Sequence, residues 1–418
     1  MKVIVLGSGV IGVTSAWYLH KAGHEVLVID RQPTAARETS FANAGQLSFG
    51  YTTPWAAPGL PLKAIKWMLR PHSPLIIHPR PSLSMLSWLY AMLKNCDLNR
   101  YQHNKSLMLR ISSYSRLCFQ ILRAETGIQY NGLQKGTIQL FRNQKQMDQI
   151  HKDVDVLKED GVHFEILDAA GCIALEPGLQ GMAASIAGGL RTPQDETGDC
   201  QIFTQHLAEL AKSRGVTFQY DTQILELEHD NHKVLSLKTN HGTQRADAYL
   251  VCMAAFSPQL LTPLGLRTPI YPVKGYSLTY PIKNEALAPR STVLDDIYKV
   301  AITRLGDSIR VGGTAEVSDY NIRLTTARRK TLLAALDMMF PGSYDQTHSS
   351  ALWSGLRPVT PDSVPILGKT PYSNLFTNAG HGTLGWTMAA GCGQFIADLI
   401  SGQKPAIDPT NLDISRYL

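Results

Sequence analysis

Two short apolar runs stand near the start of the chain, at residues 3–6 and 26–29, and a mixed stretch separates them. Short apolar runs bounded by turn residues are typical of strands that are buried on both faces. The stretch between them alternates apolar and polar positions in the manner of an amphipathic helix. The pattern therefore predicts a strand, a helix and a second, parallel strand at the start of the chain.

Farther along, the spacing of apolar residues changes between helical and strand-like patterns. Three- and four-residue spacing predicts helices over 105–126, 144–161, 168–179, 200–212 and 324–340. Apolar or alternating segments predict strands at 136–143, after Gly215, near Gln223 and within 246–256, with a turn following at Ser257-Pro258. The longer alternating segments 271–282 and 299–317 predict an antiparallel meander.

The turn after the first strand carries the glycine pattern Gly7-x-Gly9-x-x-Gly12, and the second strand ends at Asp30. Gly7 permits the tight turn, Gly9 lets a pyrophosphate approach the backbone, and Gly12 lets the helix pack closely on the sheet. The helix N-terminus offers unpaired N–H groups to phosphates, and Asp30 can accept hydrogen bonds from a ribose. The motif in this context predicts dinucleotide binding, without separating FAD from NAD.

The order of these elements predicts an α/β protein with two domains. Parallel βα elements are expected at both ends of the chain, so a nucleotide-binding domain would be discontinuous and built from 1–50, 195–260 and 350–418. A second, mostly antiparallel α+β domain for the substrate would comprise 51–194 and 261–349. Residues 51–95 would form an insert in that second domain.

Composition excludes several other classes of protein. The chain has 418 residues, 44% hydrophobic and 18% charged, as expected of a globular protein. No secretory signal is recognisable, and no run of about 18 apolar residues predicts a membrane span. The six cysteines show no C-x-x-C spacing, which argues against a zinc site or a disulfide framework, and no other metal site is expected. Reduced thiols and a cytoplasmic location are therefore expected.

The net charge of +6 is unevenly distributed. No acidic residue occurs between Glu38 and Asp97, whereas this interval holds five Lys or Arg residues and three tryptophans, namely Lys63, Lys66, Arg70, Arg80, Lys94, Trp55, Trp67 and Trp88. Such a stretch could bind nucleic acid, but the basic residues are sparse and no nucleic-acid module surrounds them. A solvated basic face and a surface resting on an anionic membrane are the two remaining interpretations.

Six segments in order resemble one known family. They are GSGVIG with Asp30, ETSFANAGQ (38–46), DETGDCQIFTQHLA (195–208), PVKGYS (272–277), GLRPVTPDSVPILG (355–368) and NAGHGTLGWTMAAG (378–391). Together they resemble the FAD-dependent D-amino-acid oxidase superfamily, over essentially the whole chain. The whole chain looks most like the bacterial D-amino-acid dehydrogenase branch, specifically its small FAD-bearing subunit. PWAAPGLPLKAIKWML (54–69) is similar to a stretch typical of that branch rather than of the oxidases. The resemblance implies a Rossmann-like FAD domain of the glutathione reductase-2 type.

The resemblance also implies which residues hold FAD. Asp30 would meet the adenosine ribose, and backbone groups of Ile224 would meet the adenine. The pyrophosphate would lie along the first segment, which comprises Val3, Ile4, Val5, Leu6, Gly7, Ser8, Gly9, Val10, Ile11, Gly12, Val13, Thr14, Ser15, Ala16 and Trp17. The flavin would lie beside Ser40, Asn43, Ala44, Gly45 and Gln46, and above Gly380, His381, Gly382, Thr383, Leu384 and Gly385.

Arg357 matches the family's arginine for the substrate carboxylate. An arginine between apolar residues and prolines is costly unless its planar fork meets a planar anion, and the alternative partner is a structural Asp or Glu. Tyr276 and Tyr51 could line the substrate pocket or pack in the core. The glycine-flanked His381 is expected to orient the backbone or pack on the flavin rather than act as a base. For Lys274, facing the flavin and facing solvent both remain open.

The function implied is oxidative deamination of D-amino acids to 2-oxo acids and ammonia. The expected partners are the D-amino acid, a quinone or other respiratory electron acceptor, the anionic inner face of the cell membrane as a peripheral contact, and further subunits in a homo- or hetero-oligomer, but no nucleic acid. One alternative is an oxidase or dehydrogenase of the same fold for glycine, sarcosine or D-hydroxyproline. The others are an NAD-dependent dehydrogenase and a flavin-binding protein without turnover.

Overall fold

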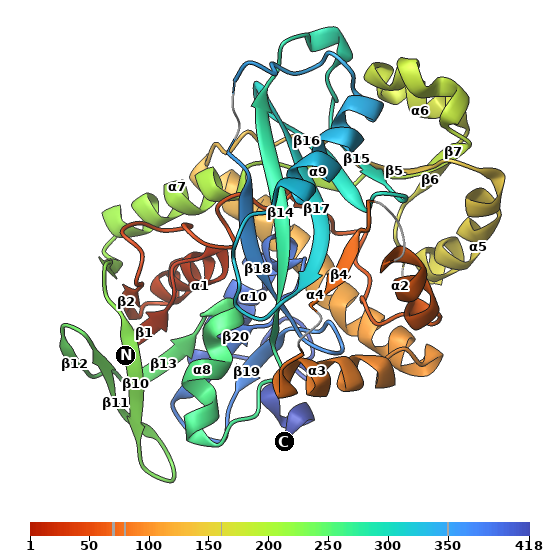
Figure 1. Cartoon of the computed structure of the whole chain (residues 1–418). Helices are drawn as coiled ribbons and strands as arrows, with labels where there is room; N and C mark the ends of the chain where they lie inside the picture. Colours follow the sequence, from red (N-terminus) through yellow and green to blue (C-terminus); the bar gives the residue numbers. More distant parts are fainter. Residues whose placement is uncertain (69–71, 79–80, 160, 349–350) are drawn as a thin grey trace.

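The computed structural model describes residues 1–68, 72–78, 81–159, 161–348 and 351–418 (Figure 1). Within these ranges the strands form two large sheets and two small ones. In Figure 1 the sheet that contains β1 lies at the lower left, and the sheet that contains β14 to β17 lies above it and to the right. Helices and the insert pack against these two large sheets.

The first large sheet is the parallel one predicted from the apolar runs. Its order is β19-β20-β13-β1-β2-β9, and all neighbours are parallel except the β19–β20 pair. Its strands come from the start, the middle and the end of the chain: β1 (Lys2–Leu6), β2 (Glu25–Ile29), β9 (Thr217–Gln219), β13 (Ala248–Val251), β19 (Ile366–Lys369) and β20 (Leu375–Ala379). The predicted opening βαβ unit is therefore confirmed.

A layer of helices packs against this sheet. The helix α1 (Val10–Lys21) contacts α7 (Cys200–Ser213) and α10 (Gly385–Ile400), and α10 in turn contacts α4 (Leu98–Thr126). Their apolar side chains share one core with the strands, which includes Val5, Phe119 and Phe395. The helix expected over 105–126 is longer than predicted, because the Asp97 carboxylate caps it by accepting the backbone N–H groups of residues 99 and 100.

The second large sheet is mostly antiparallel, as the alternating segments predicted. Its order is β18-β14-β17-β16-β15-β5-β7-β6, and β4 pairs with β17. The strands are β4 (Leu75–Ile77), β5 (Thr137–Phe141), β6 (Glu165–Leu167), β7 (Gly188–Thr192), β14 (Tyr271–Pro281), β15 (Thr292–Asp295), β16 (Val300–Leu305), β17 (Ser308–Val317) and β18 (Trp353–Val359). The helix α9 (Thr326–Met339) covers β14, β16 and β17. The helix α5 (Gln144–Glu159) packs beside β5 and β7, and α6 (Ala169–Leu175) packs beside β6 and β7.

The insert at 51–95 contributes α2 (Leu60–Met68), β4 and α3 (Leu83–Lys94). Its apolar residues, among them Met85, Trp88 and Leu60, form a cluster with Tyr271, Val273 and Val359 of the second sheet. The insert is therefore packed against the second sheet through its own small core. No helix among the described residues is long and apolar enough to cross a membrane.

The two small sheets are separate from the two large sheets. The strands β10 (Ile224–His229), β11 (Val234–Thr239) and β12 (Gly242–Gln244) form an antiparallel sheet that projects at the lower left of Figure 1. The pair β3 (Gln46–Leu47) and β8 (Glu196–Thr197) connects the loop after β2 with the segment before α7.

Three sequence expectations need correction. The strand β18 pairs with β14 in the second sheet, although it lies within the range 350–418 that was expected in the nucleotide-binding domain. The helix α4 lies within 51–194 but packs on α1 and α10 of the first core, because its buried stripe includes Met108, Cys118 and Phe119. The expected turn at Ser257-Pro258 is the first turn of α8 (Ser257–Leu261), where proline is favourable because its missing N–H would be unpaired there.

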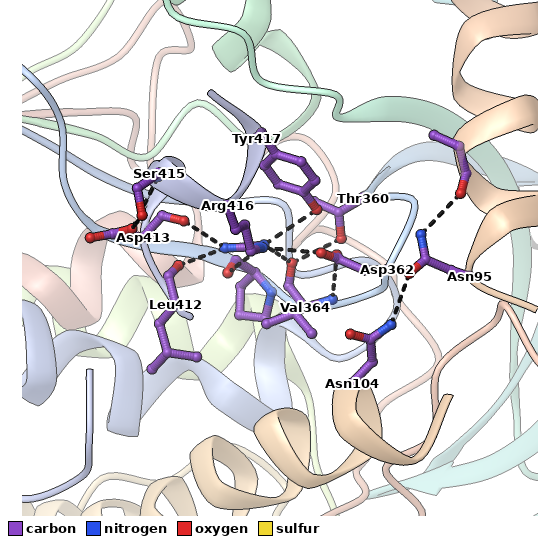
Figure 2. Close-up of polar contacts among 12 residues, drawn as sticks. Asn95, Asn104, Thr360, Asp362, Val364, Leu412, Asp413, Ser415, Arg416 and Tyr417 are labelled. Atoms are coloured by element: carbon purple, nitrogen blue, oxygen red, sulfur yellow. Dashed lines mark hydrogen bonds and ion pairs between the residues drawn. The ribbon is translucent and has the colours of Figure 1, made fainter. Parts of the chain in front are cut away.

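The connection between the two sheets is held by the end of the chain (Figure 2). Residues 360–365 lead from β18 to β19, and Arg416 donates from Nε to the Asp362 carboxylate at 3.0 Å and from Nη2 to the Val364 carbonyl at 2.7 Å. The neighbouring Ser363 hydroxyl accepts a hydrogen bond from the backbone N–H of Trp55 at 2.9 Å. The C-terminus thereby fixes both the junction of the sheets and the start of the insert.

Candidate active site

A cavity of about 770 Å³ lies between the two large sheets and the insert. Residues far apart in the sequence meet there. Of the residues expected to bind cofactor or substrate, those that line it are Gly9, Val10, Ile11, Ser40, Asn43, Ala44, Gln46, Tyr51, Tyr276, Arg357, His381, Gly382, Thr383, Leu384 and Gly385. The volume lies in the range typical of small-molecule and cofactor sites.

The three glycines of the first turn have different roles: two are needed by the fold, and one leaves space for a ligand. Gly7 has φ +109°, and a Cβ there would lie 2.7 Å from the Cys252 carbonyl oxygen; a Cβ on Gly12 would lie 1.9 Å from the Gly7 carbonyl oxygen. Both glycines are therefore required by the protein itself. A Cβ on Gly9 would meet only the Ser40 hydroxyl at 3.4 Å, and Gly9 lines the cavity. The open space beside Gly9 fits the approach of a pyrophosphate.

The helix α1 begins at this turn with its N-terminus toward the cavity. The first turn contains no acidic residue, so the partial positive charge of the helix N-terminus remains available for phosphate. The Ser40 hydroxyl accepts a hydrogen bond from the backbone N–H of Val10 at 3.0 Å, which ties the loop after β2 to the start of the helix. The loop after β2 and the glycine turn therefore form one continuous part of the cavity wall.

Other expected cofactor residues are part of the supporting structure and do not line the cavity. Residues 3–6 are buried in β1, residues 13–17 are buried in α1, Gly45 and Gly380 occupy turns with φ +75° and +78°, and Ile224 begins β10. The carboxylate of Asp30 accepts hydrogen bonds from the Ser8 N–H at 2.6 Å and from the Ser8 hydroxyl at 2.8 Å. Asp30 thus stabilises the glycine turn, and burial raises the pKa of its carboxyl despite these hydrogen bonds.

The second glycine turn, before α10, presents backbone groups to the other side of the cavity. Gly382 has φ +56°, and no acidic residue occurs in the first turn of α10. His381 is only 3% exposed, and burial lowers its pKa to about 3. A histidine with so low a pKa is neutral near pH 7 and a poor proton acceptor. This agrees with the expectation that His381 packs or orients the backbone.

Buried polar atoms without partners gather around the cavity. Among the described lining residues, the atoms that lack a hydrogen-bond partner are Gln46 Nε2, Thr314 Oγ1, Asn378 Oδ1, His381 Nε2 and Trp386 Nε1. Buried polar atoms are normally satisfied, and leaving one unpaired costs about 1–3 kcal/mol. Together with the space at Gly9 and the two helix N-termini, these atoms fit a large polar cofactor such as FAD.

Arg357 lies on β18 and reaches into this cavity. Its Nη1 donates to the Thr314 carbonyl at 2.8 Å, and its guanidinium lies flat on the backbone of Gly275, where a Cβ would be 2.3 Å from Cζ. Within the part of the chain that the structure describes, no carboxylate forms an ion pair with it. Burial lowers its pKa to about 10, so it remains charged at neutral pH. The alternative of a structural ion pair is therefore not what the structure contains.

The two tyrosines and Lys274 differ in their surroundings. Tyr51 and Tyr276 both line the cavity, but the Tyr276 hydroxyl donates to the Glu316 carboxylate at 2.7 Å. Lys274 is buried and forms an ion pair with Glu316 at 2.9 Å, so it faces neither solvent nor the cavity. The ring of Tyr276 contributes to the wall while its hydroxyl is held by this buried pair.

Several lining residues were missed by the sequence reasoning, notably Thr314, Trp353 and Asn378. The indole of Trp353 covers Gly355, where a Cβ would lie 2.2 Å from the ring. The pair Gly312-Gly313 inside a predicted strand was the available signal, because glycines in a strand often mark a bulge or a close approach of another group. Asn378 begins the segment NAGHGTLGWTMAAG (378–391) that carries part of the family resemblance, whereas nothing comparable in the local sequence marks Trp353.

Comparison with known proteins identifies the family of this chain. The sequence profile of the family described as "FAD dependent oxidoreductase" (DAO) matches residues 2–399. Two similar curated relatives are both named D-amino acid dehydrogenase: one from Rhizorhabdus wittichii is 55% identical and one from Agrobacterium fabrum is 54% identical, each over 417 residues covering 100% of both chains. The match to this family decides between the two dinucleotides in favour of FAD and between enzyme and non-catalytic carrier in favour of an enzyme.

Solved structures show the same fold. Glycine oxidase from Geobacillus kaustophilus superposes with a TM-score of 0.78 at 23% identity, covering 100% of this chain and 98% of that one. L-proline dehydrogenase from P. horikoshii gives a TM-score of 0.75 at 18% identity, covering 100% and 97%. The chain belongs to the FAD-dependent oxidoreductase (DAO) family, together with the D-amino acid dehydrogenases that it matches along its whole length.

Proposed function

We propose that this enzyme oxidatively deaminates D-amino acids. A D-amino acid and water yield a 2-oxo acid and an ammonium ion, with two electrons and two protons passing to an acceptor. The relatives that match along the full length are named for this activity. The observation that carries the proposal is Arg357, a partly buried residue in the cavity wall that, among the described residues, donates a hydrogen bond to a backbone carbonyl and pairs with no carboxylate.

The residues of the chain would bind and orient the substrate. Arg357 offers its remaining N–H groups as a planar fork to a planar carboxylate, which is the feature common to all amino acids. Tyr51, Tyr276 and Trp353 form walls around that anion and restrict the position of the Cα–H bond. The turn at Gly9 and the loop at Ser40 would hold FAD, which would supply the hydride acceptor.

The start of α10 would stabilise negative charge. Residues 382–385 line the cavity and precede or begin this helix, whose N-terminus carries a partial positive charge. Donors that are already oriented toward the site of developing charge need no reorganisation during the reaction. We assign no proton-accepting role to His381, because its low pKa makes it a weak base.

Arg357→Ala tests the proposal directly. Loss of one partner of a desolvated charge pair typically costs about 2–5 kcal/mol, which corresponds to a fall in kcat/KM of roughly 30- to 5,000-fold. Arg357→Lys should recover only part of this, since an ammonium group lacks the bidentate fork. Anaerobic bleaching of the flavin by D-alanine measures the effect on the reaction with substrate, and the visible flavin spectrum confirms that FAD is still bound. Kinetics like those of the wild type in the alanine variant would place the carboxylate elsewhere.

The same assay separates the proposed substrate class from the alternatives of the same fold. Bleaching across a panel of D- and L-amino acids, glycine, sarcosine and D-hydroxyproline would show which side chains and nitrogens are accepted. Turnover of D-amino acids in preference to L-amino acids supports the proposal. Turnover restricted to glycine or sarcosine contradicts it.

We further propose that the insert rests on the anionic inner face of the cell membrane. Its helices α2 and α3 present exposed apolar residues, which we call the insert surface: Leu62, Ile65, Met68, Leu83, Leu86, Tyr90 and Leu93. Leu83 is 86% exposed, and the exposed Lys63 and Lys66 flank these residues without any acidic neighbour in sequence. Exposed apolar patches rimmed by basic groups suit an anionic lipid surface.

Three details refine this second proposal. Trp67 and Trp55 line the cavity and Trp88 donates from its indole to the Val359 carbonyl at 2.8 Å, so the tryptophans face inward rather than toward lipid. Arg70 and Arg80 lie outside the described residues. Ile65, Met68 and Leu93 are both exposed and part of the cavity lining, so the cavity reaches the insert surface. A lipid-soluble quinone could enter there as the electron acceptor.

Sedimentation with vesicles tests the membrane contact. Near-surface basic residues contribute about 1 kcal/mol each on anionic lipid. Reversing the charge of both lysines, in Lys63→Glu/Lys66→Glu, should therefore reduce partitioning onto phosphatidylglycerol vesicles by at least about tenfold at low salt. Lys212→Glu/Lys404→Glu, which changes two exposed lysines outside the insert, is the matched control and should partition like the wild type. Equal loss of binding in both variants would show that only net charge matters.

A further inference from the structure

The strand β17 carries a bulge where it passes Arg357. Lys274 of β14 pairs with Glu316, and Tyr276 pairs with Gly313, so Thr314 and Ala315 together oppose the single residue Gly275. Thr314 has φ +56°, in the left-handed region. For a β-branched residue this conformation is strained, and such strain persists where the surrounding structure enforces it, often at functional sites.

The bulge places Thr314 in the cavity wall beside Arg357. Its carbonyl accepts the hydrogen bond from Arg357 Nη1 at 2.8 Å. Thr314 is only 4% exposed and lines the cavity, and its hydroxyl has no hydrogen-bond partner among the residues that the structure describes. A buried hydroxyl normally has a partner, so this group is available to a ligand.

We propose that Thr314 is a second anchor for the substrate carboxylate, in addition to Arg357. The carbonyl uses one N–H of Arg357 and fixes the guanidinium plane against Gly275, which leaves the other N–H groups for the carboxylate. The hydroxyl of Thr314 donates a hydrogen bond to the same carboxylate. The inference rests on the proposed role of Arg357 and adds a residue that selects for α-carboxylates through a neutral donor.

Thr314→Val is the informative substitution, because it keeps the β-branched shape and removes only the hydroxyl. Without ligand, the hydroxyl is unpaired, so its replacement by a methyl group should leave the thermal midpoint of the ligand-free holoenzyme unchanged or slightly higher. With ligand, the variant loses a hydrogen bond to a charged group. Binding of propionate, which has a carboxylate but no amino group, should weaken roughly 10- to 100-fold. Perturbation of the flavin absorbance gives the dissociation constant.

A matched control exists in the same protein. Thr268 is also buried, and its hydroxyl also lacks a partner, but it does not line the cavity. Thr268→Val should bind propionate like the wild type. Thr314→Ser retains the hydroxyl and should keep most of the affinity, which also guards against a valine variant that fails to fold.

The outcomes are distinct. A Thr314→Val protein with unchanged affinity for propionate overturns the inference. Weaker binding of D-alanine with unchanged binding of propionate also overturns it, because the hydroxyl would then meet the amino group. If the wild type itself does not bind propionate, or Arg357→Ala binds it normally, the proposed role of Arg357 has failed instead.

Discussion

At the scale of single residues, the site depends on the absence of side chains as much as on their presence. The Arg357 guanidinium lies directly against the backbone of Gly275, and the Trp353 indole lies directly against the backbone of Gly355. These two glycines are directly paired across β14 and β18. A side chain on either would displace the group that covers it. The cavity wall is therefore shaped by two paired glycines on neighbouring strands.

A methyl group at Gly9 should be compatible with folding of the protein but should weaken the binding of FAD. Its backbone, with φ −67°, is open to alanine, and a Cβ would meet only the Ser40 hydroxyl at 3.4 Å. Gly9→Ala should therefore fold, while FAD affinity falls at least about tenfold because the methyl group occupies the approach of the pyrophosphate. The flavin-to-protein absorbance ratio measures occupancy. Gly181→Ala, remote from the cavity, is the control, and full occupancy in Gly9→Ala would refute the placement.

At the scale of secondary-structure elements, buried carboxylates fix the segments that carry the second sheet. Glu176, before the 3-10 helix η1 (Pro177–Ser185), accepts backbone hydrogen bonds from Arg290 at 2.6 Å and Ser291 at 2.9 Å, just before β15. Burial raises its pKa to about 7, although these hydrogen bonds act in the opposite direction. The element junction is therefore sensitive to pH.

Glu176 should make the protein less stable as the pH rises from about 4.5 to 7. In this window the folded protein holds the proton that the unfolded chain has released, so the free energy of unfolding falls with increasing pH. With about 1.4 kcal/mol for each pH unit, the loss from this group is on the order of 3 kcal/mol. Glu176→Gln should flatten this dependence in urea titrations at pH 5 and pH 8. Replacement of the exposed Glu209, in Glu209→Gln, should leave the pH dependence unchanged. If Glu176→Gln also leaves it unchanged, Glu176 is not the source of the pH dependence.

At the scale of the whole molecule, the described strands of the two large sheets do not pair with one another, and the chain passes between the sheets several times, in one place through a short connection. Residues 360–365 run from β18 in the second sheet to β19 in the first. Arg416 and Asp362, both largely buried, hold this connection to the C-terminal turn (Figure 2). We propose that the FAD-binding domain comprises the first sheet with α1, α4, α7 and α10, and that the boundary near the C-terminus lies after Val359.

Arg416→Met should therefore destabilise the whole molecule. Removing one partner of a buried ion pair leaves the other unpaired and typically costs about 3–5 kcal/mol. The thermal midpoint of the holoenzyme should fall by several degrees, and FAD should dissociate at lower temperature because both sheets contribute to its cavity. In Asp362→Leu/Arg416→Met no unpaired charge remains, so part of the loss should be recovered. A single variant as stable as the wild type would show that the connection is held by other contacts.

The sequence by itself determined the elements and the chemistry that depend on neighbouring residues. The opening βαβ unit and the antiparallel meander follow from apolar periodicities of 3.6 and two residues, and the glycine turn follows from the spacing of its glycines. All three patterns depend only on residues close together in the sequence. Arg357 was singled out because its segment GLRP resembles the family's motif, and because an arginine between apolar residues and prolines is costly unless it is paired. Gly7 and Gly12 were correctly assigned to the turn and the helix packing.

Only the tertiary structure decided which distant groups meet. The register of β14 with β17 and β18 brings Gly275, Thr314 and Arg357 together, and no local pattern encodes that register. The same holds for the assignment of α4 to the first core and for the inward direction of Trp55, Trp67 and Trp88. These features depend on packing between segments that are tens to hundreds of residues apart, where the free energy is set by burial and by hydrogen-bond partners rather than by the local sequence.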